Sequence, residues 1–211
     1  NYFKNNNFFP RPRKGGIINN TIRVTLGTAQ QTAEFISAYR QINQPKKDTY
    51  AFIDRDGTLI YEPTPTETKP GDTPYQIDSF EKLKILPGVI EGLQKLINKN
   101  YRLVLISNQD GLGTNKFPES KFDEVQNEML RIFKDNGIEF EKIFICPHLP
   151  KNNCNCRKPK TGLLDNFIRD NNINWKKSVV IGNSNDDKDL AENLKLNFIK
   201  IKTNQAFKLN I

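Results

Sequence analysis

The chain has 211 residues, of which 36% are hydrophobic and 27% charged, and its net charge is +8 at pH 7. This length is enough for one packed domain with a small appendage. No apolar run approaches the roughly 18 residues of a membrane span, and residues 1–5 lack the basic-then-apolar order of a signal peptide. We therefore expect a soluble, cytoplasmic protein rather than an integral membrane protein.

The positive charge is concentrated in the first quarter of the chain. Residues 1–48 contain eight basic and two acidic residues, a net charge of +6, and the other 24 basic and 22 acidic residues leave only +2. A basic arm of this kind can bind nucleic acid. A solvated extension is the commoner alternative, and we favour it, so nucleic acid is not an expected partner.

The N-terminal residues have a pattern of their own. Residues 5–7 and 11–16 are predicted to be irregular, and residues 21–26 alternate as in a half-buried strand. A helix follows from residue 27, where Thr28 and Gln31 have the spacing of a capping box. One strand and one helix cannot bury a core alone, so this unit must pack on something else. We divide the chain into a small strand-helix extension, residues 1–45, and a second domain, residues 46–211.

From residue 49 onward, short apolar runs alternate with helical patterns. Strands are predicted at residues 49–53, 102–106, 142–145, 178–181 and 197–201, and helices at residues 89–97, 122–133 and 163–168. This alternation predicts an α/β fold with a Rossmann-like parallel sheet covered on both faces. Ligands bind such sheets beyond the carboxyl ends of their strands. Residues 61–80 contain four prolines and are predicted to form a loop that covers the site as a minimal cap.

Two carboxylates directly follow the first of these strands, in the sequence Asp54-Arg55-Asp56-Gly57-Thr58. Carboxylates two residues apart suit two-step phosphoryl transfer, in which Asp54 attacks phosphorus and Asp56 transfers the proton. A simple turn is the alternative. A calcium loop does not fit, because glycine follows the second acid immediately.

Polar residues follow the later strands as well. Ser107 can donate a hydrogen bond to a phosphoryl oxygen, and Lys158 can neutralise the negative charge that develops on the phosphoryl group. The acidic residues within 182–187 can hold a magnesium ion. Each residue alone could be an ordinary loop residue, but their order at successive strand ends favours a phosphatase.

All three cysteines and the single histidine lie within residues 146–156. The spacing of Cys146, His148, Cys154 and Cys156 is typical of a closed, tetrahedral zinc site. The alternatives are a disulfide, which a cytosolic enzyme disfavours, or buried structural cysteines. We expect a structural zinc that fixes the loop carrying Arg157 and Lys158.

These motifs together resemble those of the haloacid-dehalogenase superfamily. The resemblance implies that Asp54 forms an aspartyl-phosphate and that Asp56 acts as general acid and then general base. It also implies that Ser107 and Lys158 hold the phosphoryl oxygens. The implied magnesium ligands are Asp54, Asp56 through its carbonyl, Asn183 and Asp187. Asparagine at 183 departs from the family pattern, which has aspartate there, so a catalytically weakened scaffold protein is an alternative.

A narrower resemblance is to histidinol-phosphate phosphatases of the zinc-loop subgroup, carried by residues 52–60, 107–114 and 146–160. It implies hydrolysis of the phosphate monoester L-histidinol phosphate in histidine biosynthesis. The alternative substrates are heptose bisphosphates and polynucleotide 3′-phosphates. A cationic substrate needs carboxylates, so Asp78 is a further candidate contact. The expected substrate-binding residues are Asn108, Gln109, Glu62 and Arg157.

Residues 15–43 resemble the C-terminal end of histidinol-phosphate aminotransferase, in which the residue corresponding to Arg23 contacts substrate. The resemblance implies a fused or associated aminotransferase portion as a possible partner. This segment carries no pyridoxal-binding lysine motif, so we expect no transamination from this chain by itself.

Overall fold

The computed structural model describes residues 11–13, 21–23, 27–42 and 47–209. The chain divides into two compact units, residues 1–46 and residues 47–211.

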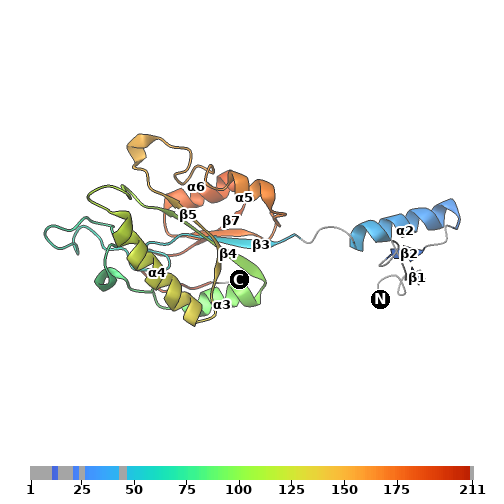
Figure 1. The fold of residues 1–211 in the computed structure, drawn as a ribbon, viewed down its shortest axis with the longest axis horizontal. Helices are drawn as coiled ribbons and strands as arrows, with labels where there is room; N and C mark the ends of the chain where they lie inside the picture. The colour runs from blue at the N-terminus through green and yellow to red at the C-terminus, as the bar shows by residue number, and fades with distance from the viewer. Residues whose placement is uncertain (1–10, 14–20, 24–26, 43–46, 210–211) are drawn as a thin grey trace. The chain divides into compact units, whose positions relative to one another are not determined.

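The larger unit is built on a five-stranded parallel sheet with the order β5-β4-β3-β6-β7 (Figure 1). Its strands are β3 (Thr49–Ile53), β4 (Tyr101–Asn108), β5 (Phe140–Cys146), β6 (Val179–Gly182) and β7 (Asn197–Lys200). The central strand β3 pairs with β4 on one side and β6 on the other. The predicted parallel α/β fold is therefore confirmed, and all five predicted strands are present.

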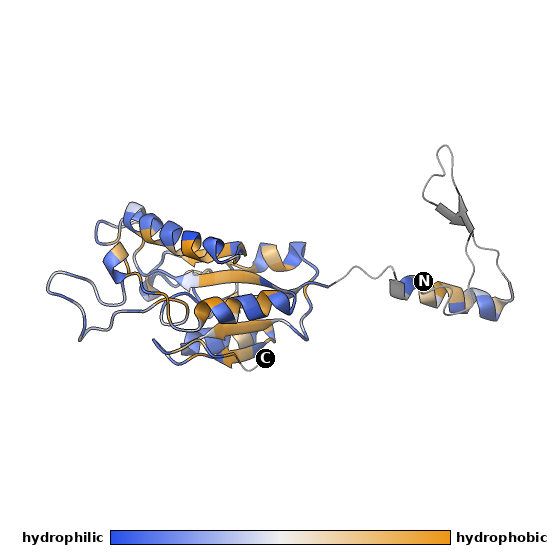
Figure 2. Cartoon of the chain, turned by 90° about the horizontal axis from the view of Figure 1, so that it is seen from below, coloured by the Kyte–Doolittle hydropathy of each residue, from blue (hydrophilic) through white to orange (hydrophobic). Residues whose placement is uncertain are grey.

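Helices cover both faces of the sheet (Figure 1), and the hydrophobic residues are concentrated in the strands and along one side of the helices (Figure 2). The buried apolar side chains form one core on each face of the sheet. One face packs against α3 (Val89–Asn98) and α4 (Glu119–Asp135), and the other against α5 (Asp165–Asp170) and α6 (Asn185–Leu194). Side chains of β3 alternate between the two cores. In the part of the chain that the structure describes, no helix is both long and apolar enough to cross a membrane.

Helix α6 was not predicted from the sequence. Its first five residues, Asn185 to Asp189, are all polar, and only Leu190, Ala191 and Leu194 are buried apolar residues. The apolar stripe is too short to produce a clear helical period. The helix begins instead at a capping box formed by Ser184 and Asp187.

In the smaller unit, β1 (Arg11–Arg13) and β2 (Thr21–Arg23) form an antiparallel pair, and α2 spans Ala29–Ile42. The prediction that residues 11–13 are irregular was wrong. The predicted strand at 21–26 is described only as far as residue 23. The predicted capping box is confirmed, because Thr28 Oγ1 accepts from the Gln31 amide at 3.2 Å and Gln31 Oε1 accepts from the Thr28 amide at 2.9 Å.

Helix α3 contains Gly92, whose position leaves no room for a side chain. A Cβ atom there would lie 2.4 Å from Cδ1 of the buried Phe207 ring. Helix propensity alone predicts that Gly92→Ala stabilises the protein by up to about 1 kcal/mol. We expect the opposite in urea unfolding, a loss of about 1–2 kcal/mol from overpacking.

A smaller side chain at position 207 should reverse the sign of the effect of Gly92→Ala on stability. In a Phe207→Leu background, Gly92→Ala should raise the free energy of unfolding. Stabilisation by Gly92→Ala in the native background would show that the ring moves aside without cost.

Candidate active site

The site is centred on a buried lysine between two carboxylates. Lys158 Nζ lies 2.5 Å from Asp54 Oδ1 and 2.6 Å from Asp187 Oδ1. The three residues are 4%, 8% and 1% exposed, respectively. Asp54 comes directly after β3, and Lys158 Nζ also donates to the carbonyl of Ile106 in β4 at 3.1 Å. The sheet thus brings together residues that are about 100 positions apart.

Asp187 is fixed by the start of α6. Its Oδ2 accepts from the Ser184 amide at 3.0 Å and from the Ser184 hydroxyl at 2.6 Å, and its Oδ1 binds Lys158. Both carboxylate oxygens are therefore engaged. Asp187 orients Lys158 in this geometry, and its role as a magnesium ligand stays a prediction.

Asp56 is held by three neighbours. Its Oδ1 forms an ion pair with Arg55 at 2.7 Å, and its Oδ2 accepts from Gln109 Nε2 and, at 3.2 Å, from the Ser107 hydroxyl. Arg55 is fully buried with its guanidinium over the Phe122 ring, and Nε and Nη2 have no hydrogen-bond partner among the described residues. Ser107 and Gln109, predicted to contact phosphate and substrate, both bind Asp56 here.

The loop before Lys158 is attached to β4 by Asn108. Its side-chain oxygen accepts from the Lys158 amide at 3.0 Å, and its Nδ2 donates to the Lys158 carbonyl at 3.2 Å. Arg157 forms an ion pair with Asp110 and donates to the His148 carbonyl at 3.1 Å. Asn108 therefore positions the backbone of Lys158, a role that was not predicted from the sequence.

Asn183 approaches the nucleophile from the end of β6. Its Oδ1 lies 3.2 Å from the Thr58 hydroxyl, which also donates to Asp54 Oδ2 at 3.0 Å. Its Nδ2 is close to the backbone of Gly57, where an added Cβ would come within 2.4 Å of it. Glycine is thus required at 57 both by this contact and by a φ of +71°.

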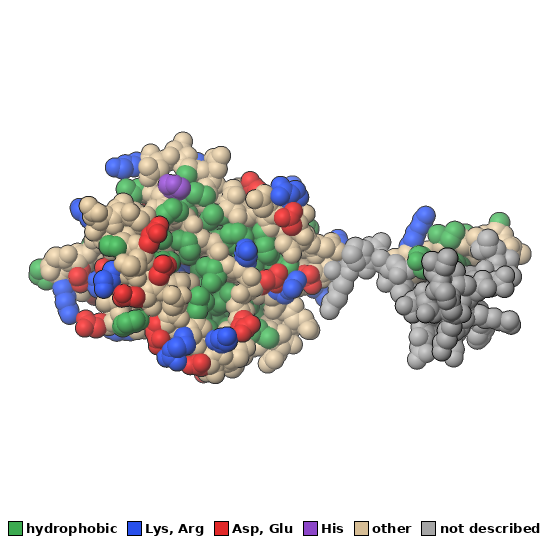
Figure 3. Space-filling view, in the orientation of Figure 1, with side chains coloured by type: hydrophobic (Ala, Val, Ile, Leu, Met, Phe, Trp, Pro, Cys, Tyr) green, Lys and Arg blue, Asp and Glu red, His purple; other side chains and the backbone are tan. Residues whose placement is uncertain are grey.

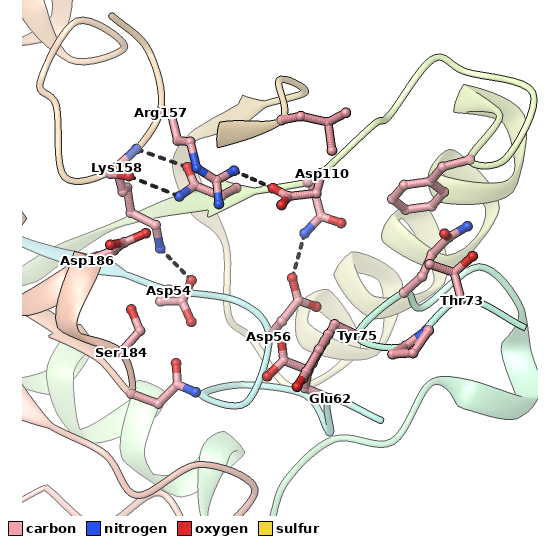
Figure 4. A pocket seen from close by; sticks show the side chains of 17 residues that line it. Asp54, Asp56, Glu62, Thr73, Tyr75, Asp110, Arg157, Lys158, Ser184 and Asp186 are labelled. Carbon is pink, nitrogen blue, oxygen red and sulfur yellow. Dashed lines mark hydrogen bonds and ion pairs between the residues drawn. The ribbon is translucent and has the colours of Figure 1, made fainter. Parts of the chain in front are cut away.

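A cavity of about 460 Å³ opens above these residues (Figure 4). The cap loop contributes Thr73, Pro74, Tyr75 and Gln76 to its wall, and Glu62 brings a further carboxylate beside Asp56. All four predicted substrate contacts line it, namely Asn108, Gln109, Glu62 and Arg157. Asp78 does not line it but forms an ion pair with Lys82 at 2.7 Å, so its predicted contact was wrong. Ser107 is likewise not among the residues that line the cavity, and its hydroxyl donates to Asp56.

Burial and charge set the protonation of the site. Burial raises the pKa of Asp54, and the charge of Asp187 adds to this, whereas Lys158 opposes it. Burial lowers the pKa of Lys158. The negative charges of Asp54 and Asp187 together have the larger effect, so the pKa of the lysine is raised. Burial, with Asp56 and Asp54 nearby, raises the pKa of Glu62 to about 8. The lysine therefore remains a cation, and Glu62 can release its proton to solvent when a cation binds beside it.

The four predicted metal ligands lie together at the end of β5 and in the loop that follows it. The ligand atoms of Cys146, His148, Cys154 and Cys156 are all within 4.8 Å of one another. Cys146 Sγ lies 3.7 Å from Cys154 Sγ and 3.4 Å from Cys156 Sγ. These separations are far beyond a disulfide bond, and about 3.8 Å separates two sulfurs in a tetrahedral zinc site with Zn–S of about 2.3 Å.

Two aspartates directly after β3, a serine near the end of β4 and a lysine in the loop after β5 form the motif order of an aspartate-dependent phosphatase of the haloacid-dehalogenase type. Residues 49–206 match the family model described as polynucleotide kinase 3 phosphatase. The chain belongs to this family.

Two named relatives define the relationship more narrowly than the family model does. The chain is 52% identical over 143 residues to the histidine biosynthesis bifunctional protein HisB of Actinobacillus pleuropneumoniae, covering 68% of this chain and 37% of that protein. It is 42% identical over 158 residues to the HisB protein of Legionella pneumophila, covering 75% and 42%. The predicted relationship to proteins of histidine biosynthesis is confirmed. The chain spans about two fifths of the length of these relatives.

A solved structure supports the fold. The D,D-heptose 1,7-bisphosphate phosphatase of B. bronchiseptica, complexed with magnesium and phosphate, superposes with a TM-score of 0.62 at 24% identity. The alignment covers 74% of this chain and 81% of that one. At this identity the likeness concerns the fold alone.

The buried Arg55–Asp56 pair yields a stability prediction. Asp56→Asn removes the charge that balances Arg55, so the free energy of unfolding should fall by about 3 kcal/mol in urea titrations. The double variant Asp56→Asn with Arg55→Met should recover much of this loss, because no unpaired cation remains. A single variant as stable as the native chain would show that Arg55 does not depend on Asp56.

Proposed function

We propose that this chain hydrolyses L-histidinol phosphate to L-histidinol and phosphate, a step of histidine biosynthesis in the cytoplasm. The substrate assignment rests on the position of Glu62, which places a carboxylate in the same cavity as Asp54 and Asp56. It suits the amine or imidazole of this substrate, since the phosphate is bound at the other end by Lys158. The HisB relatives support the same assignment.

In this proposal Asp54 attacks phosphorus and becomes an aspartyl-phosphate, and Lys158 stabilises the negative charge on the phosphoryl oxygens. Asp56 protonates the leaving alkoxide and then removes a proton from the water that releases phosphate. The Ser107 hydroxyl, which donates to Asp56, can turn to a phosphoryl oxygen when that contact opens. Arg157 lies at the rim of the cavity and provides a further cation.

The oxygen donors around Asp54 fit a magnesium ion. Asp54 Oδ2 and Asn183 Oδ1 lie 3.0 Å and 3.2 Å from one hydroxyl, that of Thr58, so a carboxylate and an amide oxygen face the same space. We propose these two oxygens and the Asp56 carbonyl as its ligands. Bound there, magnesium would reduce the repulsion between the nucleophile and the phosphate.

A second candidate is a polynucleotide 3′-phosphatase, which the name of the matching family favours. On the face seen in Figure 3, however, acidic and basic side chains of residues 47–209 are interspersed and form no basic stripe. We therefore prefer a small phosphate monoester. We also propose a fused or associated aminotransferase portion as a partner, on the resemblance of residues 15–43 to the C-terminal end of that enzyme.

The substrate assignment can be tested with a panel of phosphate esters. With magnesium, kcat/KM should be highest for histidinol phosphate, compared with heptose 1,7-bisphosphate and a 3′-phosphorylated oligonucleotide. Asp54→Asn should abolish turnover of all three. Preference for the oligonucleotide would replace our proposal with the second candidate, and no turnover of any ester would favour a scaffold protein.

Glu62→Gln should raise KM for histidinol phosphate about tenfold or more, the value of one lost charge-assisted contact, but leave p-nitrophenyl phosphate unaffected. Because the pKa of Glu62 is about 8, more of it is ionised as pH rises from 6 to 8. The native KM for histidinol phosphate should therefore fall over this range, and the variant should lose that dependence. Equal effects on both esters would exclude Glu62 from substrate recognition.

We also propose that the cysteine cluster binds one structural zinc per chain. Metal analysis after dialysis should find zinc at one equivalent, independent of added magnesium. Cys154→Ser should lower the zinc content, whereas Ser184→Ala should not. Folded native protein without zinc, or with a disulfide among these cysteines, would contradict this assignment.

A further inference from the structure

The loop after β7, residues 201–205, lies against two segments of the active site. The Asn204 side chain pairs with the backbone of Glu62, accepting from its amide and donating to its carbonyl, both at 2.8 Å. The Asn204 amide also donates to the Gly57 carbonyl at 3.0 Å. These three hydrogen bonds fix the loop beside the catalytic turn. The position of the neighbouring Thr203 is thereby fixed as well.

Thr203 contacts Asn183. The Asn183 Nδ2 donates to Thr203 Oγ1 at 3.1 Å. The opposite end of the same amide, Oδ1, lies 3.2 Å from the Thr58 hydroxyl on the side of Asp54. The amide is thus held with its nitrogen toward the β7 loop and its oxygen toward the nucleophile.

This orientation matters because an amide, unlike a carboxylate, has one oxygen end and one NH₂ end. A reversed Asn183 would place two N–H donors where a cation is to bind. The Thr58 hydroxyl has a single proton, for which Asp54 Oδ2 and Asn183 Oδ1 compete. A cation bound by Asp54 and Asn183 would satisfy the amide oxygen and leave that proton to Asp54.

We infer that Thr203 is a positioning residue that makes Asn183 a competent magnesium ligand by fixing its amide orientation. The inference rests on the proposed magnesium site. With aspartate at 183 either carboxylate oxygen could bind the cation, so the contact with Thr203 would lose this role. The effect of Thr203 is therefore specific to asparagine at this position.

The test is calorimetric titration with magnesium chloride of the native chain, Thr203→Val and Thr203→Ser. Each is also prepared with Asn183→Asp. Thr203→Val keeps the shape but removes the hydroxyl and should weaken magnesium binding roughly three- to tenfold, the value of one hydrogen bond. Thr203→Ser should bind like the native chain. Asn183→Asp alone should tighten binding about tenfold, and in that background Thr203→Val should change it less than about twofold.

Two results would overturn the role of Thr203, namely native affinity in Thr203→Val or an equal loss in both backgrounds. If the native chain itself binds no magnesium, the proposed metal site fails and the inference fails with it. Thermal unfolding without magnesium checks folding. Should Thr203→Val be unfolded, Thr203→Ala replaces it, with Thr203→Ser as its hydroxyl-bearing control.

Discussion

The active site depends on one buried cation. Lys158 is almost completely enclosed, and it lies within 2.6 Å of both Asp54 and Asp187. Neither carboxylate could remain ionised at this depth without it, and the lysine could not remain protonated without them. The neighbouring contacts serve this arrangement. Asn108 holds the lysine backbone, and the α6 cap holds Asp187.

The arrangement of the sheet could be predicted because its strands are buried on both faces. Continuous apolar runs such as residues 49–53 and 178–181 have few other interpretations, and their order determines where the polar residues meet. Two elements that contain no continuous apolar run, α6 and β1, were not predicted. Helix α6 depends on its capping box, and β1 contains a proline between two arginines, which is not a strand pattern.

The side chains that meet at the candidate site could be predicted, but their mutual contacts could not. Arg55 in a polar turn reads as a solvent-exposed residue, yet it is fully buried and paired with Asp56. Asn108 and Gln109 were predicted as substrate contacts. No sequence signal distinguishes a side-chain amide that binds substrate from one that positions another residue of the site. Thr203 lies 145 residues from Thr58 in the chain, and only the folded structure brings both to Asn183.

The location of the nucleophile has a consequence for dynamics. Asp54 follows β3, which is hydrogen-bonded to strands on both sides and buried against both helical layers. Amides in such a central strand exchange with solvent only when the whole domain opens, whereas proline-rich surface loops open locally. In the proposed function, the cap loop can therefore fluctuate to admit a phosphate ester and release phosphate while the Asp54 carboxylate keeps its place. Ligand entry and the proposed chemistry then belong to parts of the domain with different local stabilities.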